Sequence, residues 1–273
     1  MKLAFIGGGN MAQALIIGLK NQQALGQQFA MQNITVIELD ANKHAALAKF
    51  GVNATIDIAQ VQTCDVIVLA IKPQQLPALA KKLAALLNTQ LIISIAAGIR
   101  LADLSRWLGN YKTIIRAMPN TPAQIQAGIT GLYAMPNVTT QQINLADQIL
   151  GAAGNTIWLD SEEKLDAVTA ISGSGPAYVF YLIEALQAAA LSLGLNEVQA
   201  KQLSIATFKG ASLLADASET PIATLREQVT SKGGTTEQGL LSLQQSQVQQ
   251  AIILAAQKAC ERAKTLGIEL GLD

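Results

Sequence analysis

The chain opens with a short apolar run that leads directly into three glycines, and this feature restricts its fold more than any other. Residues 2–6 have the length of a strand, and a stretch of helical period begins at Asn10. The turn between them, residues 7–12, reads Gly-x-Gly-x-x-Ala. Such a turn is typical of dinucleotide-binding folds, in which it holds a pyrophosphate at the helix N-terminus. The alternative is a plain glycine turn without a ligand.

The first 160 residues alternate short β-branched runs with longer stretches rich in Ala, Leu and Gln. This alternation predicts an α/β fold with a Rossmann-type, mostly parallel sheet. The first four runs are almost continuously hydrophobic, which predicts that helices cover both faces of these strands. The predicted strands are residues 2–6, 34–38, 66–71, 91–95, 112–117, 129–133 and 157–159.

After Asp160 the strand-like runs stop and helical patterns take over. We expect an N-terminal Rossmann domain in residues 1–160 and a C-terminal all-helical dimerisation domain in residues 161–273. Gly194 and Gly267 are expected to end helices, and Pro176 and Pro221 to lie in first turns. The predicted helices are residues 162–171, 176–193 and 196–217, a short one after Pro221, and a last one over 235–267.

One predicted helix carries a stripe of apolar and small side chains. Such a stripe can pack on the core of its own chain, or its small residues can permit close packing against a second chain. The sequence leaves both interpretations open. The stripe consists of Leu182, Ala185, Leu186, Ala189, Ala190 and Leu193.

Charge and composition exclude several partners. Nineteen basic residues balance nineteen acidic ones, so no global field attracts nucleic acid or an anionic membrane. Neither a signal peptide nor an apolar run of about 18 residues is present, which predicts a cytoplasmic protein with no membrane partner. Cys64 and Cys260 lie far apart and suggest neither a zinc site nor a disulfide, and no bound metal is expected. The single histidine, His44, is expected in an exposed first helical turn.

An acidic residue, Glu38, stands at the end of the second predicted strand. In dinucleotide-binding folds an acid at this place accepts hydrogen bonds from the adenosine ribose hydroxyls, and it would repel a 2′-phosphate. No arginine follows it, so the local chemistry favours NADH. The other interpretation is a solvated acid at a strand end.

Two further strand ends are expected at the same edge of the sheet. Lys72 and Pro73 follow the third predicted strand, and the small residues 94–98 follow or end the fourth. Ligands of open α/β sheets bind at this carboxyl edge, so both segments are candidates for cofactor contacts. Lys72 could equally be a surface lysine before a turn.

Three segments combine turn residues with hydroxyl groups: residues 116–123, 172–178 and 229–236. In the last of them two glycines and several hydroxyls precede a long predicted helix. This arrangement predicts a nest of N–H donors for a small carboxylate. A helix cap with a flexible approach is the alternative.

Together, the glycine turn, Lys72-Pro73, the turn at residues 119–122, residues 172–178 and residues 221–244 resemble pyrroline-5-carboxylate reductase. The resemblance covers essentially the whole chain, and Thr230-Ser231-x-Gly233-Gly234-x-Thr236 is its most specific motif. It implies reduction of Δ1-pyrroline-5-carboxylate to L-proline by hydride transfer, the last step of proline biosynthesis. It also implies homo-oligomers built from dimers, with a decamer as one candidate, in which one subunit's C-terminal domain closes another's active site. NADPH is the cofactor that the family favours and is ranked first, with NADH second because of Glu38.

The resemblance also assigns individual residues. It implies substrate contacts at Glu162, Thr235 and Thr236, with Ser231 and Gly234 beside them. No His or Cys lies in these motifs, so the Thr236 hydroxyl is the expected catalytic hydrogen-bond donor to the imine nitrogen. The implied cofactor contacts are Ile6, Gly7, Gly8, Gly9, Asn10, Met11, Ala70, Lys72, Ile95 and Ala97, besides Glu38.

Two positions depart from the family pattern, and two rival functions remain. Ile58 stands where many relatives have an Asn that touches the adenosine side of the cofactor, and Lys232 stands where Pro is common. A β-hydroxyacid dehydrogenase would place a lysine on the helix after residues 173–175, and none is there. A non-catalytic dinucleotide sensor would need no substrate loop such as residues 231–236.

Overall fold

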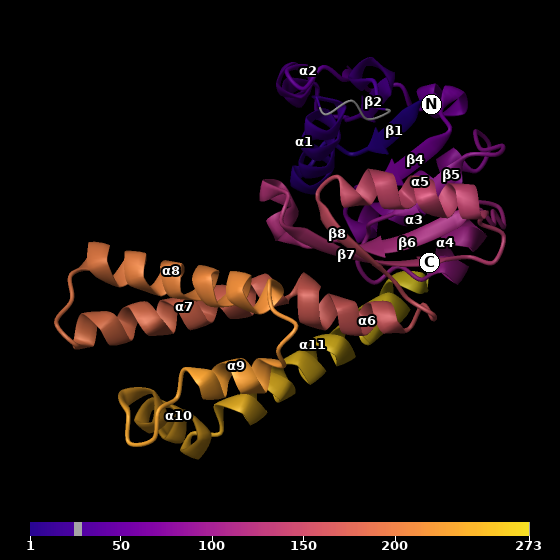
Figure 1. Ribbon diagram of the computed structural model, residues 1–273. Helices are drawn as coiled ribbons and strands as arrows, with labels where there is room; N and C mark the ends of the chain where they lie inside the picture. Colours follow the sequence, from indigo (N-terminus) through magenta and orange to yellow (C-terminus); the bar gives the residue numbers. More distant parts are fainter. Residues whose placement is uncertain (25–28, 273) are drawn as a thin grey trace. The chain divides into compact units, whose positions relative to one another are not determined.

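The structure is a computed structural model that describes residues 1–24 and 29–272 (Figure 1). Its internal contacts divide the chain into two compact units. Unit 1 comprises Met1–Ser174 and Ala259–Asp273, and unit 2 comprises Gly175–Lys258. Unit 1 thus holds the sheet-forming part of the chain together with the end of the last helix.

A single eight-stranded sheet forms the centre of unit 1, with the order β3-β2-β1-β4-β5-β6-β7-β8 (Figure 1). The pair β6–β7 is antiparallel, and the other six pairs are parallel. The carboxyl ends of β1, β2, β4 and β5 therefore meet at one edge. The strands are β1 (Leu3–Ile6), β2 (Ile34–Ile37), β3 (Asn53–Thr55), β4 (Val66–Leu69), β5 (Leu91–Ser94), β6 (Ile114–Met118), β7 (Gly128–Ala134) and β8 (Gly154–Trp158).

The seven strands predicted from the sequence are confirmed. The sequence did not predict β3, because Asn53-Ala54-Thr55 is a three-residue edge strand with polar ends and gives no hydrophobic pattern.

Helices cover both faces of the sheet, as the hydrophobic runs predict. In β1, Leu3 and Phe5 point into a core cluster shared with α1 and α5, while Ala4 and Ile6 point into a second cluster shared with α3 and α4. All four side chains are buried. The helices of unit 1 are α1 (Asn10–Ala24), α2 (His44–Ala48), α3 (Leu76–Leu83), α4 (Leu101–Trp107), α5 (Thr140–Gly151) and α6 (Lys164–Val168). Short 3₁₀ turns lie at Met31–Asn33, Ala41–Lys43, Ile58–Thr63, Pro73–Gln75 and Thr121–Ile125.

The helix predicted over residues 162–171 is present in modified form. Helix α6 passes into a π-helical turn, Thr169–Gly173, which ends just before unit 2. Gly131 of β7 lets this helix lie close to the sheet, because a Cβ there would lie 2.8 Å from Cγ1 of Val168.

Unit 2 is helical (Figure 1). Helices α7 and α8 lie side by side, and Gly194 ends α7 with a positive φ of 90°, as predicted. Asn196 and Gln199 form a capping box at the start of α8. The helices are α7 (Gly175–Ser192), α8 (Glu197–Asp216), α9 (Ile222–Gln228), α10 (Thr235–Gln245) and α11 (Val248–Gly271), whose last part belongs to unit 1.

Three details of the helix prediction are wrong. The single helix expected over residues 235–267 is broken between α10 and α11 at Gln247, which has a left-handed φ of 54°. Gly267 does not end a helix, since α11 continues to Gly271; a Cβ on Gly267 would lie 2.6 Å from the carbonyl oxygen of Gly98, so close packing explains this glycine. Pro221 does not lie in the first turn of α9, as expected, but immediately before this helix, at its N-cap.

The stripe on α7 is not part of a core within the single chain. No residue of α7 is buried, and Leu193 is 82% exposed. The neighbouring Phe180 and Tyr181 are 63% and 71% exposed. These observations favour packing against a second chain.

Within residues 1–24 and 29–272, no helix has both the length and the apolar character needed to cross a membrane.

Candidate active site

The glycine turn joins β1 to α1 and is folded tightly against its neighbours. The Gly7 amide donates to the Ile37 carbonyl at 2.8 Å, and Gly7 has a φ of 97°. A Cβ on Gly7 would lie 2.5 Å from the carbonyl oxygen of Ala70. Only glycine therefore fits at this position.

The other side of the turn is open. Gly9 and Asn10 are exposed, and a Cβ on Gly9 would meet no atom within 4 Å. Because the first N–H groups of a helix have no intrahelical acceptor, the start of α1 offers hydrogen-bond donors and a positive helix end to this space. An anionic pyrophosphate fits this cradle.

Glu38 is bound to the glycine turn itself. Its Oε2 accepts the Gly8 amide at 3.0 Å, its Oε1 accepts the Asp40 amide at 3.0 Å, and Lys43 Nζ lies 3.6 Å from Oε2. Partial burial raises the pKa of the Glu38 carboxyl, but the two amide hydrogen bonds and the charge of Lys43 outweigh it, so this pKa lies below its usual value. The carboxylate is ionised at neutral pH.

His44 is not fully exposed, contrary to expectation. It opens α2 half-buried, and its Nε2 lies 2.6 Å from the carbonyl oxygen of Glu38. The ring thus fixes the backbone at the end of β2.

The other expected cofactor residues of unit 1 follow the carboxyl ends of β4 and β5. The Ala70 amide donates to the Ile6 carbonyl at 2.8 Å, and the Ile95 amide donates to the Leu69 carbonyl at 3.2 Å. Lys72 is exposed at the start of a 3₁₀ turn, and Ala97 is half-buried. The structure therefore brings the expected cofactor residues together at one edge of the sheet. Ile58 opens another 3₁₀ turn and packs against the core, so it offers no polar group there.

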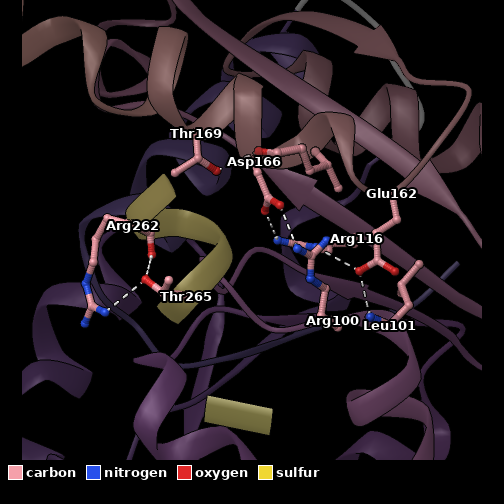
Figure 2. Close-up of polar contacts among 9 residues, drawn as sticks. Arg100, Leu101, Arg116, Glu162, Asp166, Thr169, Arg262 and Thr265 are labelled. Atoms are coloured by element: carbon pink, nitrogen blue, oxygen red, sulfur yellow. Dashed lines mark hydrogen bonds and ion pairs between the residues drawn. The ribbon is translucent and has the colours of Figure 1, made fainter. Parts of the chain in front are cut away.

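A buried ionic cluster that was not predicted from the sequence lies between β6 and α6 (Figure 2). The side chains of Arg116 and Asp166 are only 4% and 1% exposed, with Arg116 Nη2 3.7 Å from Asp166 Oδ1. Arg100 Nη2 donates to Asp166 Oδ2 at 2.6 Å. A charged residue in the middle of the apolar run Ile114–Met118 was the available signal, because a buried charge needs a partner.

Glu162 belongs to this cluster. Its Oε1 accepts hydrogen bonds from Arg116 Nη1 and from the Leu101 amide, both at 2.8 Å (Figure 2). Although β8 points away from the edge with the glycine turn, the Glu162 side chain contacts Leu101, four residues after Ala97, and Arg116, which pairs with Ser94 at the end of β5. Its substrate contact stays a prediction.

The turn at residues 119–122 and the segment that begins at residue 172 meet within unit 1. Asn120 Nδ2 donates to the Ser172 carbonyl at 3.1 Å, while Asn120 Oδ1 accepts the Ile129 amide at 2.9 Å. A Cβ on Gly173 would lie 2.7 Å from Cε of Met118. Two of the three hydroxyl-bearing segments, residues 116–123 and 172–178, are thus in contact with each other just after β6.

The third segment lies in unit 2 and forms a loop before α10. The Gly234 amide donates to the Ser231 carbonyl at 3.0 Å, and the Gly233 amide donates to Glu237 Oε2 at 2.7 Å. Thr235 and Thr236 are the first two residues of α10, and both are exposed. Their amides have no intrahelical acceptor, so they, rather than Gly234, are the donors that the loop presents to a ligand.

Comparison with known proteins identifies both parts of the chain. Residues 162–266 match the family model described as pyrroline-5-carboxylate reductase dimerisation, and residues 2–98 match NADP oxidoreductase, coenzyme F420-dependent. The chain is 43% identical to the pyrroline-5-carboxylate reductase of Pseudomonas aeruginosa, over 97% of this chain and 98% of the relative.

Solved structures give the same result. A pyrroline-5-carboxylate reductase from Coxiella burnetii is 40% identical with a TM-score of 0.91, covering 97% of this chain and 98% of that one. The Plasmodium falciparum pyrroline carboxylate reductase, solved with NADP bound, is 29% identical with a TM-score of 0.86, covering 98% of each chain. At this identity and coverage, the chain belongs to the pyrroline-5-carboxylate reductase family.

Proposed function

We propose that this chain reduces Δ1-pyrroline-5-carboxylate to L-proline with NAD(P)H. One C=N bond becomes C–N, with a hydride added at carbon and a proton at nitrogen. When bound, the cofactor supplies the hydride. The proposal rests on the open space beside Gly9 at the start of α1. The family match over nearly the whole chain supports it.

On the cofactor side, the glycine turn and the start of α1 hold the pyrophosphate. Residues Ile6, Gly7, Gly8, Gly9, Asn10 and Met11 form this turn, and Ala70, Lys72, Ile95 and Ala97 follow the adjacent strand ends. Lys72 is exposed and adds a positive charge at this edge, which suits an anionic ligand.

On the substrate side, the loop before α10 holds the carboxylate of the imino acid. The Thr235 and Thr236 amides bind it at the positive end of the helix, with Ser231 and Gly234 shaping the turn. A Cβ on Gly234 would lie 2.5 Å from Ser231 Oγ, so a larger residue would displace that hydroxyl. The Thr236 hydroxyl donates a hydrogen bond to the imine nitrogen and polarises it for hydride addition. Glu162 is kept as a substrate contact.

At the level of the assembly, the chain forms homo-oligomers through its dimerisation region. We assign the Rossmann domain to residues 1–160 and the dimerisation domain to residues 161–273. We further propose that ten subunits assemble into a ring and that the protein is located in the cytoplasm.

The test is a spectrophotometric assay of NAD(P)H loss with pyrroline-5-carboxylate, applied to the wild type and to Thr236→Val. The variant should lower kcat/KM about 10- to 100-fold, or ~1.4 to 2.7 kcal/mol, for one hydrogen bond lost in the transition state. Thr207→Val is the matched control, because the Thr207 hydroxyl donates only to the Leu203 carbonyl of its own helix. Absence of wild-type turnover would refute the function, whereas unchanged kinetics in Thr236→Val would refute only the role of Thr236.

A further inference from the structure

The end of β2 carries chemistry that bears on the choice between NADH and NADPH. In a Rossmann fold the pyrophosphate lies on the glycine turn and the adenosine ribose lies beside the end of the second strand. Glu38 follows β2 directly, and its carboxylate is bonded to the Gly8 amide of that turn. The Glu38 carboxylate therefore borders the place of the ribose hydroxyls, where NADPH carries its 2′-phosphate.

The Glu38 side chain cannot easily move away to make room for a phosphate. It is 12% exposed, and both carboxylate oxygens accept backbone amides, those of Gly8 and Asp40. Gly8 is buried, so rotation of Glu38 would leave its N–H without this acceptor. The fold thus holds a negative charge in place.

The surroundings offer little positive charge to offset a phosphate. Lys43 is already paired with Glu38, and Asp40 adds a second acid two residues further on. NADPH-binding Rossmann folds commonly place an arginine near the 2′-phosphate, and this chain contains no arginine before Arg100. Leu39, which follows Glu38, is 81% exposed and apolar.

We propose that Glu38 makes this reductase prefer NADH over NADPH by accepting hydrogen bonds from the ribose hydroxyls and excluding the 2′-phosphate. This inference rests on the proposed function, since it needs the dinucleotide at this edge of unit 1. It reverses the order in which the family resemblance ranks the two cofactors.

The decisive experiment measures dissociation constants of NADH and NADPH for the full-length protein by cofactor fluorescence, without substrate. The wild type should bind NADH at least about 10-fold more tightly, which corresponds to about 1.4 kcal/mol. Glu38→Gln keeps an oxygen for the Gly8 amide but removes the charge. In this variant the ratio of the NADPH dissociation constant to the NADH dissociation constant should fall toward one. Adding Leu39→Arg to Glu38→Gln should make NADPH the tighter ligand. The ratio of kcat/KM with NADH to kcat/KM with NADPH should fall in the same order, from the wild type through Glu38→Gln to the double variant.

The matched control is Asp40→Asn, which removes the same charge two residues away from the proposed contact. A shift in this control as large as that in Glu38→Gln would overturn the assignment to Glu38. Equal or tighter binding of NADPH by the wild type would overturn the preference while leaving the reductase activity intact. If neither cofactor binds, the proposed function fails and the preference fails with it.

Discussion

Among single residues, the most consequential besides Glu38 is Arg116. It is buried in β6 and neutralises two carboxylates from the segment after β8, Glu162 and Asp166. A buried charge is costly when unpaired, so the cluster ties the two segments to each other. This explains why a strand of otherwise apolar residues tolerates an arginine.

We predict that Arg116→Met destabilises the protein strongly. Removing one partner of a buried ion pair costs about 3 to 5 kcal/mol, and the lower value is expected because Arg100 still pairs with Asp166. The measurement is the urea unfolding midpoint at one fixed protein concentration, since oligomerisation shifts apparent stability. As a control, Lys164→Met breaks the exposed pair with Asp160 and should leave the midpoint unchanged. Equal midpoints for Arg116→Met and the wild type would contradict this account.

At the scale of elements, the end of α11 supports the loop after β5. Gly267 packs against the carbonyl oxygen of Gly98, and Arg106 Nη2 donates to the Gly271 carbonyl at 2.7 Å. Gly98 directly follows Ala97, one of the proposed cofactor contacts. The last helix therefore positions a loop of the cofactor edge within unit 1.

We predict that Gly267→Ala weakens cofactor binding. Its Cβ would lie 2.6 Å from the Gly98 carbonyl oxygen, so the backbone of the loop or of α11 must shift, at a cost of about 1 to 3 kcal/mol in stability. The dissociation constant of NADH should rise, as measured by fluorescence titration. Gly210→Ala on α8 is the control, since a Cβ there meets no atom within 4 Å. An unchanged dissociation constant in a folded Gly267→Ala protein would show that the contact does not position the loop.

At the scale of the whole molecule, unit 2 has too little core to account for its own apolar surface. In α8 only Ala200 and Ser204 are buried, and in α7 no residue is. Large apolar surface of this kind marks a protein interface. Assembly with further copies of the chain therefore completes the fold of unit 2.

We predict that Leu186→Arg on the α7 stripe reduces the size of the assembly. An arginine without a partner is costly in an apolar interface, so the oligomer should dissociate into smaller assemblies. Light scattering coupled to gel filtration at micromolar protein would measure the mass. Gln148→Arg, at an exposed position of α5 in unit 1, introduces the same side chain and should leave the mass unchanged. Identical masses for Leu186→Arg and the wild type would exclude the stripe from the interface.

Features of this protein that depend on local pattern can be predicted from the amino-acid sequence alone. The glycine turn, seven strands and the acid at the end of β2 are readable because strand hydrophobicity, glycine geometry and strand-end chemistry are properties of neighbouring residues. The family followed from motifs in their order along the chain.

Features that depend on contacts between distant segments emerge only in the folded chain. The pairing of Arg116 with Glu162 and Asp166, the packing of Gly267 on Gly98, and the hydrogen bond from Gly8 to Glu38 join residues from separate elements. The helix break at Gln247 was not predicted because no glycine or proline stands there. Such features are set by which surfaces meet in the folded chain, and a local pattern does not contain that information.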